Sequence, residues 1–142
     1  MKTIDDIRVC SAKFFARHWH SDLLGHPVPA WKGWEPFLSG SIPHYDLAGC
    51  YALFRGEELQ YVGKGDSKGG GAYPNHGLSR RIDKHVTQLD RQREGYWSKL
   101  QGGWKEITAL YTIGFPHDVA YLCVSLESFL IRELGPPANS RV

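Results

Sequence analysis

Two short apolar runs on either side of a polar turn decide the fold of this chain. They read Gly49-Cys50-Tyr51-Ala52-Leu53-Phe54 and Leu59-Gln60-Tyr61-Val62-Gly63. Both runs are rich in aromatic or β-branched residues, and Arg-Gly-Glu-Glu separates them at residues 55–58, so we expect a β-hairpin. On this hairpin Tyr51 and Tyr61 lie on paired antiparallel strands, close enough to share one pocket.

A basic helix is expected beyond the hairpin. After a glycine-rich loop the chain reads Leu78-Ser79-Arg80-Arg81-Ile82-Asp83-Lys84-His85. Apolar residues continue at helical spacing and predict a helix from residue 78 to about residue 93. Arg81 and His85 are four residues apart, so they share a face of this helix and both can point toward the hairpin.

Three further elements are predicted by hydrophobic periodicity: a helix over residues 3–18, a strand over 106–113 and a final helix over 119–134. Glu127 lies beside the apolar face of the final helix. A carboxylate at the edge of a buried stripe needs a partner, either a base or a metal.

The segment from residue 21 to residue 47 contains four prolines and is expected to be irregular. Its aromatic residues Trp31, Trp34 and Phe37 are expected to pack on the flank of the core, and the alternative is a surface that stacks on DNA bases. We therefore expect residues 1–48 to form a helical and irregular extension, packed on an α/β domain of residues 49–142.

Composition restricts the class of protein. The 142 residues suit a single compact domain, and no apolar run approaches the roughly 18 residues of a membrane helix. The acidic N-terminus does not resemble a signal peptide, so we expect a cytoplasmic protein without a membrane partner. Cys10, Cys50 and Cys123 are too few and too scattered for a disulfide framework, and buried reduced thiols are expected.

Positive charge is concentrated in one third of the chain. The net charge is only +2, but residues 61–105 contain nine basic and four acidic side chains. A local excess of this kind favours a polyanionic partner, although a solvated helix face has the same composition.

The candidate residues together fit metal-dependent hydrolysis of a phosphodiester. A hard divalent cation takes oxygen ligands, often one carboxylate with waters and the substrate phosphate, and Glu127 can supply the carboxylate. An arginine such as Arg81 can stabilise the charge that develops on the phosphoryl oxygens. A tyrosine or histidine can accept a proton from the attacking water.

The sequence also resembles the GIY-YIG nuclease superfamily through four motifs that occur in order. Gly49-Cys50-Tyr51 stands at the GIY element and Tyr61-Val62-Gly63 at the YIG element. The stretch Leu78-x-x-Arg81-x-x-x-His85 matches the L-x-x-R-x-x-x-H helix. The C-terminal motifs of the superfamily, E-x-x-L-I followed by P-x-x-N, are matched by Leu126-Glu127-x-x-Leu130-Ile131 with Pro136 and Asn139. The long loop over residues 65–77 is similar to that of the compact restriction enzymes of the superfamily.

The resemblance implies a three-stranded antiparallel sheet flanked by helices, and it implies roles for five catalytic residues. Glu127 would ligate one Mg²⁺ or Mn²⁺ ion, and Arg81 would bind the scissile phosphate. Tyr51 would accept a proton from water or orient the water. Tyr61 would bond to phosphate or water, and His85 would assist.

Further side chains near these motifs are expected to bind the substrate: Lys64, Lys68, Arg80, Lys84 and Asn139. Asn139 is expected mainly to hold its loop close to the site. Counting from Leu78 and from His85 selects Arg81 as the phosphate ligand, and the adjacent Arg80 points about 100° away.

These inferences predict a stand-alone DNA endonuclease, acting as a monomer or homodimer on duplex DNA like a restriction enzyme, or on single strands. The alternative is a catalytically inactive nucleic-acid-binding module. Taken singly, each candidate also has a purely structural interpretation: hairpin packing for the tyrosines, a surface ion pair for Arg81 and a solvated helix flank for Glu127.

Overall fold

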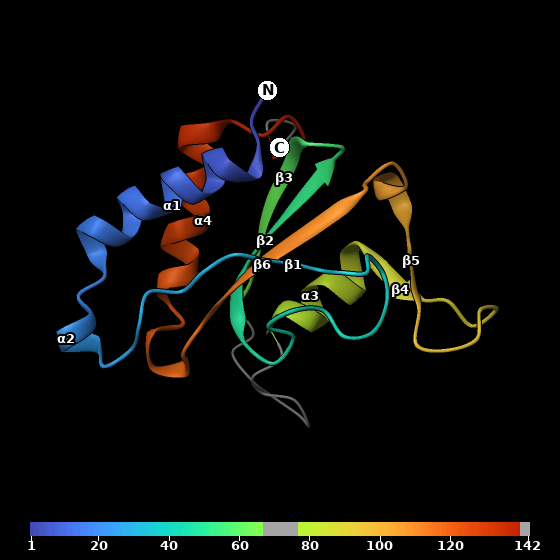
Figure 1. Cartoon of the computed structure of the whole chain (residues 1–142), viewed down its shortest axis with the longest axis horizontal. Helices are drawn as coiled ribbons and strands as arrows, with labels where there is room; N and C mark the ends of the chain where they lie inside the picture. The colour runs from blue at the N-terminus through green and yellow to red at the C-terminus, as the bar shows by residue number, and fades with distance from the viewer. Residues whose placement is uncertain (67–76, 140–142) are drawn as a thin grey trace.

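A four-stranded antiparallel sheet forms the centre of an α/β fold in a computed structural model that describes residues 1–66 and 77–139 (Figure 1). Its strands lie in the order β1-β6-β2-β3 and are β1 (Lys32–Gly33), β2 (Ala48–Arg55), β3 (Glu58–Gly65) and β6 (Ala109–Phe115). The helices are α1 (Ile4–His18), α2 (Ser21–Leu24), α3 (Gly77–His85) and α4 (Leu122–Leu134), with 3₁₀ turns η1 (Gly102–Trp104) and η2 (His117–Val119). A separate two-stranded sheet pairs β4 (Thr87–Leu89) with β5 (Ser98–Leu100).

The predicted hairpin is confirmed as β2 and β3, and it occupies the centre and one edge of the sheet. All residues of β2 from Ala48 to Phe54 are buried, because helices pack on both of its faces. Cys50, Ala52 and Phe54 face α1 and α4. Tyr51 and Leu53, on the opposite face, pack with α3. The alternation of strand side chains therefore separates the interior into two apolar clusters.

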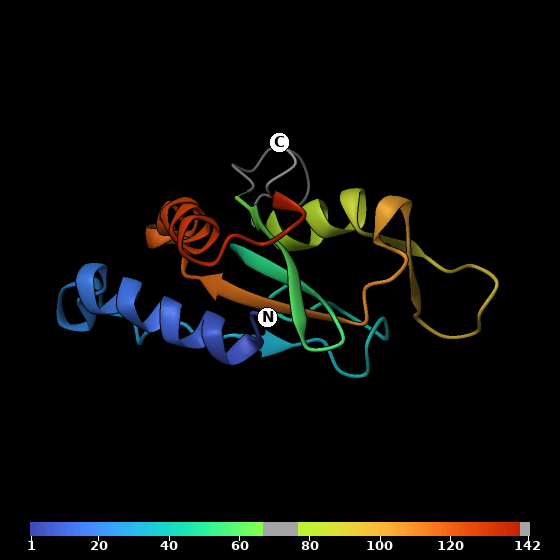
Figure 2. The same ribbon diagram turned by 90° about the horizontal axis from the view of Figure 1, so that it is seen from above.

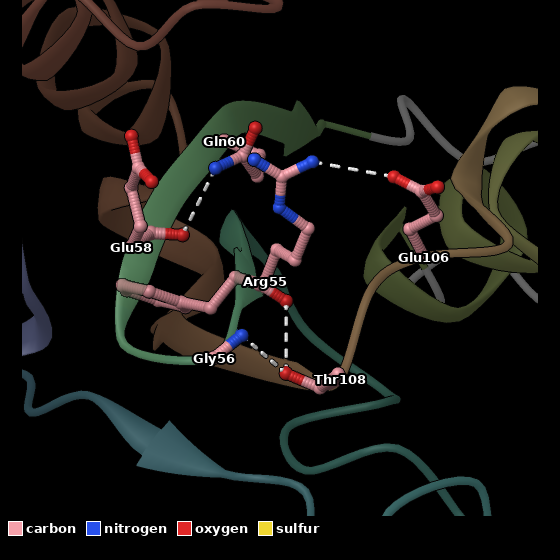
Figure 3. A network of polar contacts seen from close by, with 7 residues as sticks. Arg55, Gly56, Glu58, Gln60, Glu106 and Thr108 are labelled. Carbon is pink, nitrogen blue, oxygen red and sulfur yellow. Dashed lines mark hydrogen bonds and ion pairs between the residues drawn. The ribbon is translucent and has the colours of Figure 1, made fainter.

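Polar contacts fasten the turn of this hairpin to the segment before β6 (Figure 3). Thr108 accepts a hydrogen bond from the Gly56 N–H at 2.7 Å, and its own N–H donates to the Phe54 carbonyl at 2.8 Å. Arg55 and Glu106 form an ion pair at 3.2 Å across the same junction. Since both partners are exposed, the ion pair contributes little to stability. The two hydrogen bonds of Thr108, one through its hydroxyl and one through its N–H, hold the turn in place.

Close packing of the hairpin against β6 and against α3 requires glycine at two paired positions. Gly49 and Gly65 are directly opposite each other on β2 and β3. A Cβ at Gly49 would collide with the Ile113 carbonyl oxygen, and one at Gly65 would collide with the backbone of Gly77 at the start of α3. The Leu78 N–H also donates to the Leu47 carbonyl at 3.0 Å. The first turn of α3 therefore packs directly against the backbone of β3, with no side chain between them.

The N-terminal aromatic residues pack in the interior, which confirms the core interpretation. Trp31 and Trp34 are 7% and 3% exposed, and the indole N–H groups donate to the Ser11 hydroxyl and the Ser39 carbonyl. Phe37 packs edge-on against Trp34. The two indoles are thus enclosed and cannot serve as base-stacking surfaces.

The helix predicted over residues 78–93 is wrong in its second half, because α3 ends at His85. Gln101 closes this end, where its side-chain amide donates to the carbonyls of Asp83 and Thr87. The Thr87 hydroxyl donates to the Asp83 carboxylate at 3.2 Å. The chain then turns back through β4 and β5, and the loop between them projects away from the body of the protein (Figure 2).

Three smaller differences concern strand and helix boundaries. The sheet has four strands rather than three, because the two residues of β1 pair with β6. The third predicted strand is shifted, since β6 spans Ala109–Phe115. The final helix begins at Leu122, after η2. A two-residue strand is too short to show a period of two in the sequence.

The N-terminal helix is confirmed over Ile4–His18. The glycine-rich loop lies largely outside the described residues. Within the described ranges, none of the helices is both long enough and apolar enough to cross a membrane.

We predict that Gly49→Ala destabilises the protein by about 1–3 kcal/mol or more, because the added methyl group must displace strand backbone. Urea unfolding monitored by circular dichroism would measure the change. Gly103→Ala is the matched control, since its Cβ would meet no atom within 4 Å, and it should change stability by less than about 0.5 kcal/mol. Equal stability of the two variants would contradict the close approach of the β6 backbone to Gly49.

Candidate functional site

The two hairpin tyrosines lie side by side on the face of the sheet that α3 covers. The ring centroids of Tyr51 and Tyr61 are 6.0 Å apart, and Trp104 packs on the other side of Tyr61 at 5.0 Å. Tyr51 is 1% exposed, whereas Tyr61 is only partly buried. The two tyrosines are therefore neighbours, in a row of three tilted aromatic rings with Tyr51 at its buried end.

Gly63 provides the space in which the Tyr51 ring lies. The two residues are cross-strand partners on β2 and β3, so their side chains would project from the same face. A Cβ at position 63 would collide with the Tyr51 ring carbons and lie 2.5 Å from its hydroxyl oxygen. The glycine of the Tyr61-Val62-Gly63 motif is thus a steric requirement for the orientation of Tyr51.

Arg81 on α3 reaches the same tyrosine pair. Its guanidinium lies within hydrogen-bonding reach of the Tyr51 phenol and lowers the pKa of that phenol. Burial, reinforced by the neighbouring Tyr61, acts in the opposite direction and dominates, so the pKa of Tyr51 is raised well above its ordinary value. Tyr51 consequently keeps its proton near neutral pH and can donate or accept a hydrogen bond as a neutral phenol.

The carboxylate of Glu127 belongs to the opposite side of the hairpin, on α4. It is half-buried, and burial is the main cause of its raised pKa. The positive charges of Lys64 and Arg81 lower that pKa, and the nearby Asp66 raises it. Since Arg81 acts on both Tyr51 and Glu127, it connects the tyrosine side of the site with the carboxylate side.

The position of β3 at the edge of the sheet explains how the tyrosine side and the Glu127 side of the site come together. Tyr61 and Gly63 face α3, while Lys64 is the cross-strand partner of Cys50 and faces α4. Because β3 is an edge strand, side chains from both faces can converge around its last residues. Lys64 lies 3.7 Å from Asp66, which directly follows the strand.

Asn139 is held by the main chain of β3. Its side-chain oxygen accepts from the Val62 N–H, and its side-chain N–H donates to the Val62 carbonyl, both at 2.9 Å. The Ala138 N–H donates to the Gln60 carbonyl. The residues after α4 therefore pair with the outer edge of β3, on both sides of Tyr61 in the strand. This placement agrees with the expected role of holding the loop.

The remaining predicted site residues have fewer contacts with Tyr51, Arg81 and Glu127. His85 is exposed, one turn beyond Arg81, and its pKa is lowered by slight burial and by the charges of Arg81 and Lys84. Arg80 and Lys84 are exposed on one face of α3. Lys68 lies outside the described residues.

A metal would fit this site only as an ion held by few protein ligands. Across residues 1–66 and 77–139 there is no group of three or more His, Cys, Asp or Glu side chains arranged to hold an ion. Glu127, with Asp66 nearby, offers oxygen atoms of the kind that Mg²⁺ and Mn²⁺ prefer. Such ions commonly keep several waters and use substrate phosphate as a ligand, and this donor set is compatible with that mode.

The cysteines take no part in this chemistry. All three are buried and free, as predicted. The Cys50 thiol donates to the Cys123 carbonyl at 3.2 Å, and burial raises the pKa of Cys123 to about 12. Both thiols near Glu127 therefore remain protonated and poorly nucleophilic.

Three contributors to the site were missed in the sequence. Gly63 was recognised only as part of a motif, although the hairpin register places it opposite Tyr51. Asp66 has no distinguishing pattern around it. Trp104 is distant from the motifs along the chain, and only the tertiary fold brings it to Tyr61.

Comparison of the chain with protein-family models, with curated proteins and with solved structures found no match.

We predict that stability falls as pH rises above about 10, the ordinary pKa of tyrosine, and continues to fall until the raised pKa of Tyr51 is reached. In this range the unfolded chain releases the Tyr51 proton but the folded chain retains it, so folding loses up to about 1.4 kcal/mol per pH unit. Tyr51→Phe should lack this contribution. Urea midpoints of the two proteins across alkaline pH measure it, and parallel curves would contradict the burial of the phenol.

Proposed function

We propose that this protein is a stand-alone DNA endonuclease that hydrolyses phosphodiester bonds with one divalent metal ion, similar to GIY-YIG nucleases. The observation that carries the proposal is the convergence on Arg81. This one guanidinium acts on both the buried tyrosine pair and the half-buried carboxylate of Glu127. Residues from β2, β3, α3 and α4 that are far apart in sequence thus contribute to one polar site.

The metal, Mg²⁺ or Mn²⁺, would be held by Glu127. When bound there, such an ion polarises the phosphoryl group and neutralises charge on its oxygens. Glu127 is suited to this role because its partial burial excludes competing water, while Lys64 and Arg81 favour its ionised form.

The protein groups then divide the remaining tasks. Arg81 binds the scissile phosphate and stabilises the charge that develops in the transition state. Tyr51, which retains its proton, orients the attacking water through its phenol, and this role is favoured over that of a general base. Tyr61 is partly exposed beside it and can bond to the phosphate or the same water.

His85 is the candidate that can accept a proton at neutral pH. Its lowered pKa keeps the imidazole neutral, and its position one turn from Arg81 places it on the same face of α3. Lys64 would contact a neighbouring phosphate in exchange for its weak pairing with Asp66. The cytoplasmic location and the choice between monomer and homodimer remain predictions from the sequence.

We predict that Glu127→Gln lowers metal-dependent cleavage by at least about 100-fold and leaves DNA binding in EDTA nearly unchanged. Single- and double-stranded substrates of matched sequence would be incubated with Mg²⁺ or Mn²⁺, and the new ends mapped on gels. Glu133→Gln, an exposed carboxylate on the same helix, is the matched control and should cleave like wild type. Wild-type protein that binds DNA but cuts neither substrate would favour the inactive binding module.

We also predict that Arg81→Ala abolishes cleavage without unfolding the protein, because Arg81 is exposed and its loss leaves no cavity in the core. Single-turnover cleavage and circular dichroism would be measured together. Arg132→Ala removes an exposed positive charge from α4 and serves as the charge-matched control. Full activity of Arg81→Ala would exclude this arginine as the phosphate ligand.

A further inference from the structure

A cavity of about 430 Å³ lies on the flank of α3 opposite Arg81. Its walls come from three segments: residues 40–45, the outer side of α3 and residues 96–98 at the start of β5. On a helix with 100° per residue, Leu78 and Ile82 form the buried stripe. Arg81 lies on one side of that stripe, whereas Ser79 and Asp83, which line the cavity, lie on the other.

A basic surface connects the cavity with the candidate site. Going around the exposed side of α3 from Arg81, the helical spacing places Lys84 first and then Arg80, which lines the cavity. All three side chains are exposed. The four ion pairs between described residues include none of them. A phosphodiester strand bound at Arg81 therefore meets two more positive charges on its way across the helix.

The lining of the cavity has the chemistry of a nucleotide site. Tyr96 is 67% exposed and offers an aromatic face at the rim, and Arg80 offers a guanidinium. The Asp83 carboxylate and the hydroxyls of Ser41 and Ser98 are suited to the polar edges of a base. The volume is within the range of small-ligand pockets, and it is sufficient for one nucleotide rather than for a duplex.

The cavity walls are held in place by backbone hydrogen bonds. The Gly40 N–H donates to the Tyr96 carbonyl, and the Ser98 N–H donates to the Leu38 carbonyl, both at 2.8 Å. Ser39 and Trp97 form a further antiparallel bridge between the same segments. On α3, the Thr87 hydroxyl fixes the Asp83 carboxylate. A ligand would therefore find the cavity largely formed, which reduces the entropy cost of binding.

We propose that this cavity holds one unpaired nucleotide of the DNA strand whose scissile phosphate lies at Arg81. The base stacks on Tyr96, the phosphate pairs with Arg80, and the strand crosses the exposed face of α3. This inference rests on the proposed function and selects between its two substrates, since an unpaired base is available in a single strand. The consecutive arginines then have separate tasks, with Arg81 at the chemistry and Arg80 at a neighbouring nucleotide.

An abasic scan tests the inference without catalysis. Wild-type protein in EDTA would be titrated against a labelled single-stranded oligonucleotide and against versions with one base removed at each position, with fluorescence anisotropy as the readout. Removal of the base that occupies the cavity should weaken binding by at least about fivefold. Tyr96→Ala should weaken binding of the intact strand by a similar factor and should no longer distinguish the intact strand from that abasic strand.

Two control variants separate stacking from general effects. Tyr96→Phe keeps the ring and should bind like wild type. Tyr121→Ala removes a tyrosine that is similarly exposed, at 66%, but does not line the cavity, and it should bind like wild type. Arg80→Ala should weaken binding of the intact strand, and Arg80→Lys should restore part of it.

The outcomes distinguish the inference from the proposed function. If each abasic position weakens binding equally, or if Tyr96→Ala binds like wild type, the cavity does not hold a base. Duplex binding that is tighter than single-strand binding and insensitive to Tyr96 also overturns the inference, as does absence of DNA binding. If the abasic pattern is found but Mg²⁺ and Mn²⁺ support no cleavage, the nuclease proposal fails and the nucleotide site stands.

Discussion

The structure depends on three positions of the β2–β3 hairpin where a side chain cannot be accommodated. Gly49 allows the backbone of β6 to approach β2, Gly65 allows α3 to approach β3, and Gly63 leaves room for the Tyr51 ring. Gly65 sets the position of the helix that carries Arg81, and Gly63 sets the position of the phenol that Arg81 reaches. Close packing on glycine thus sets the geometry between the helix and the tyrosines, and the polar contacts form within that geometry.

A polar site at the edge of a sheet combines two environments. The inner end, at Tyr51, is dry, and the pKa of the phenol is raised. The outer end, at Arg81 and His85, is open to solvent and suited to a charged ligand. Glu127 lies between these extremes, half-buried and balanced between like and opposite charges. In this arrangement the exposed cations lie toward solvent, and the groups behind them are already desolvated.

The local elements with strong periodic signals were predicted well from the sequence, and the motif spacing brought Tyr51, Arg81 and Glu127 to attention, which the structure places near one another. Helix α1 and the hairpin follow directly from hydrophobic spacing. Helix α3 was predicted too long because residues 86–93 continue the apolar pattern, whereas Gln101, from beyond β5, donates to the Asp83 carbonyl in the helix and to the Thr87 carbonyl just after it. The cavity beside Arg80 is also a product of three distant segments, so no local pattern indicates it.

The pairing of Asn139 with Val62 has a consequence for the association of this protein with itself. Strand β3 is the last strand of the sheet, and an open edge can recruit a strand from another molecule. The Asn139 amide imitates a peptide group and occupies both hydrogen-bonding atoms of Val62, while Ala138 occupies the Gln60 carbonyl. The segment after α4 therefore covers part of the exposed edge of β3. Without this segment, the same backbone groups would be open to pairing with a strand of another molecule.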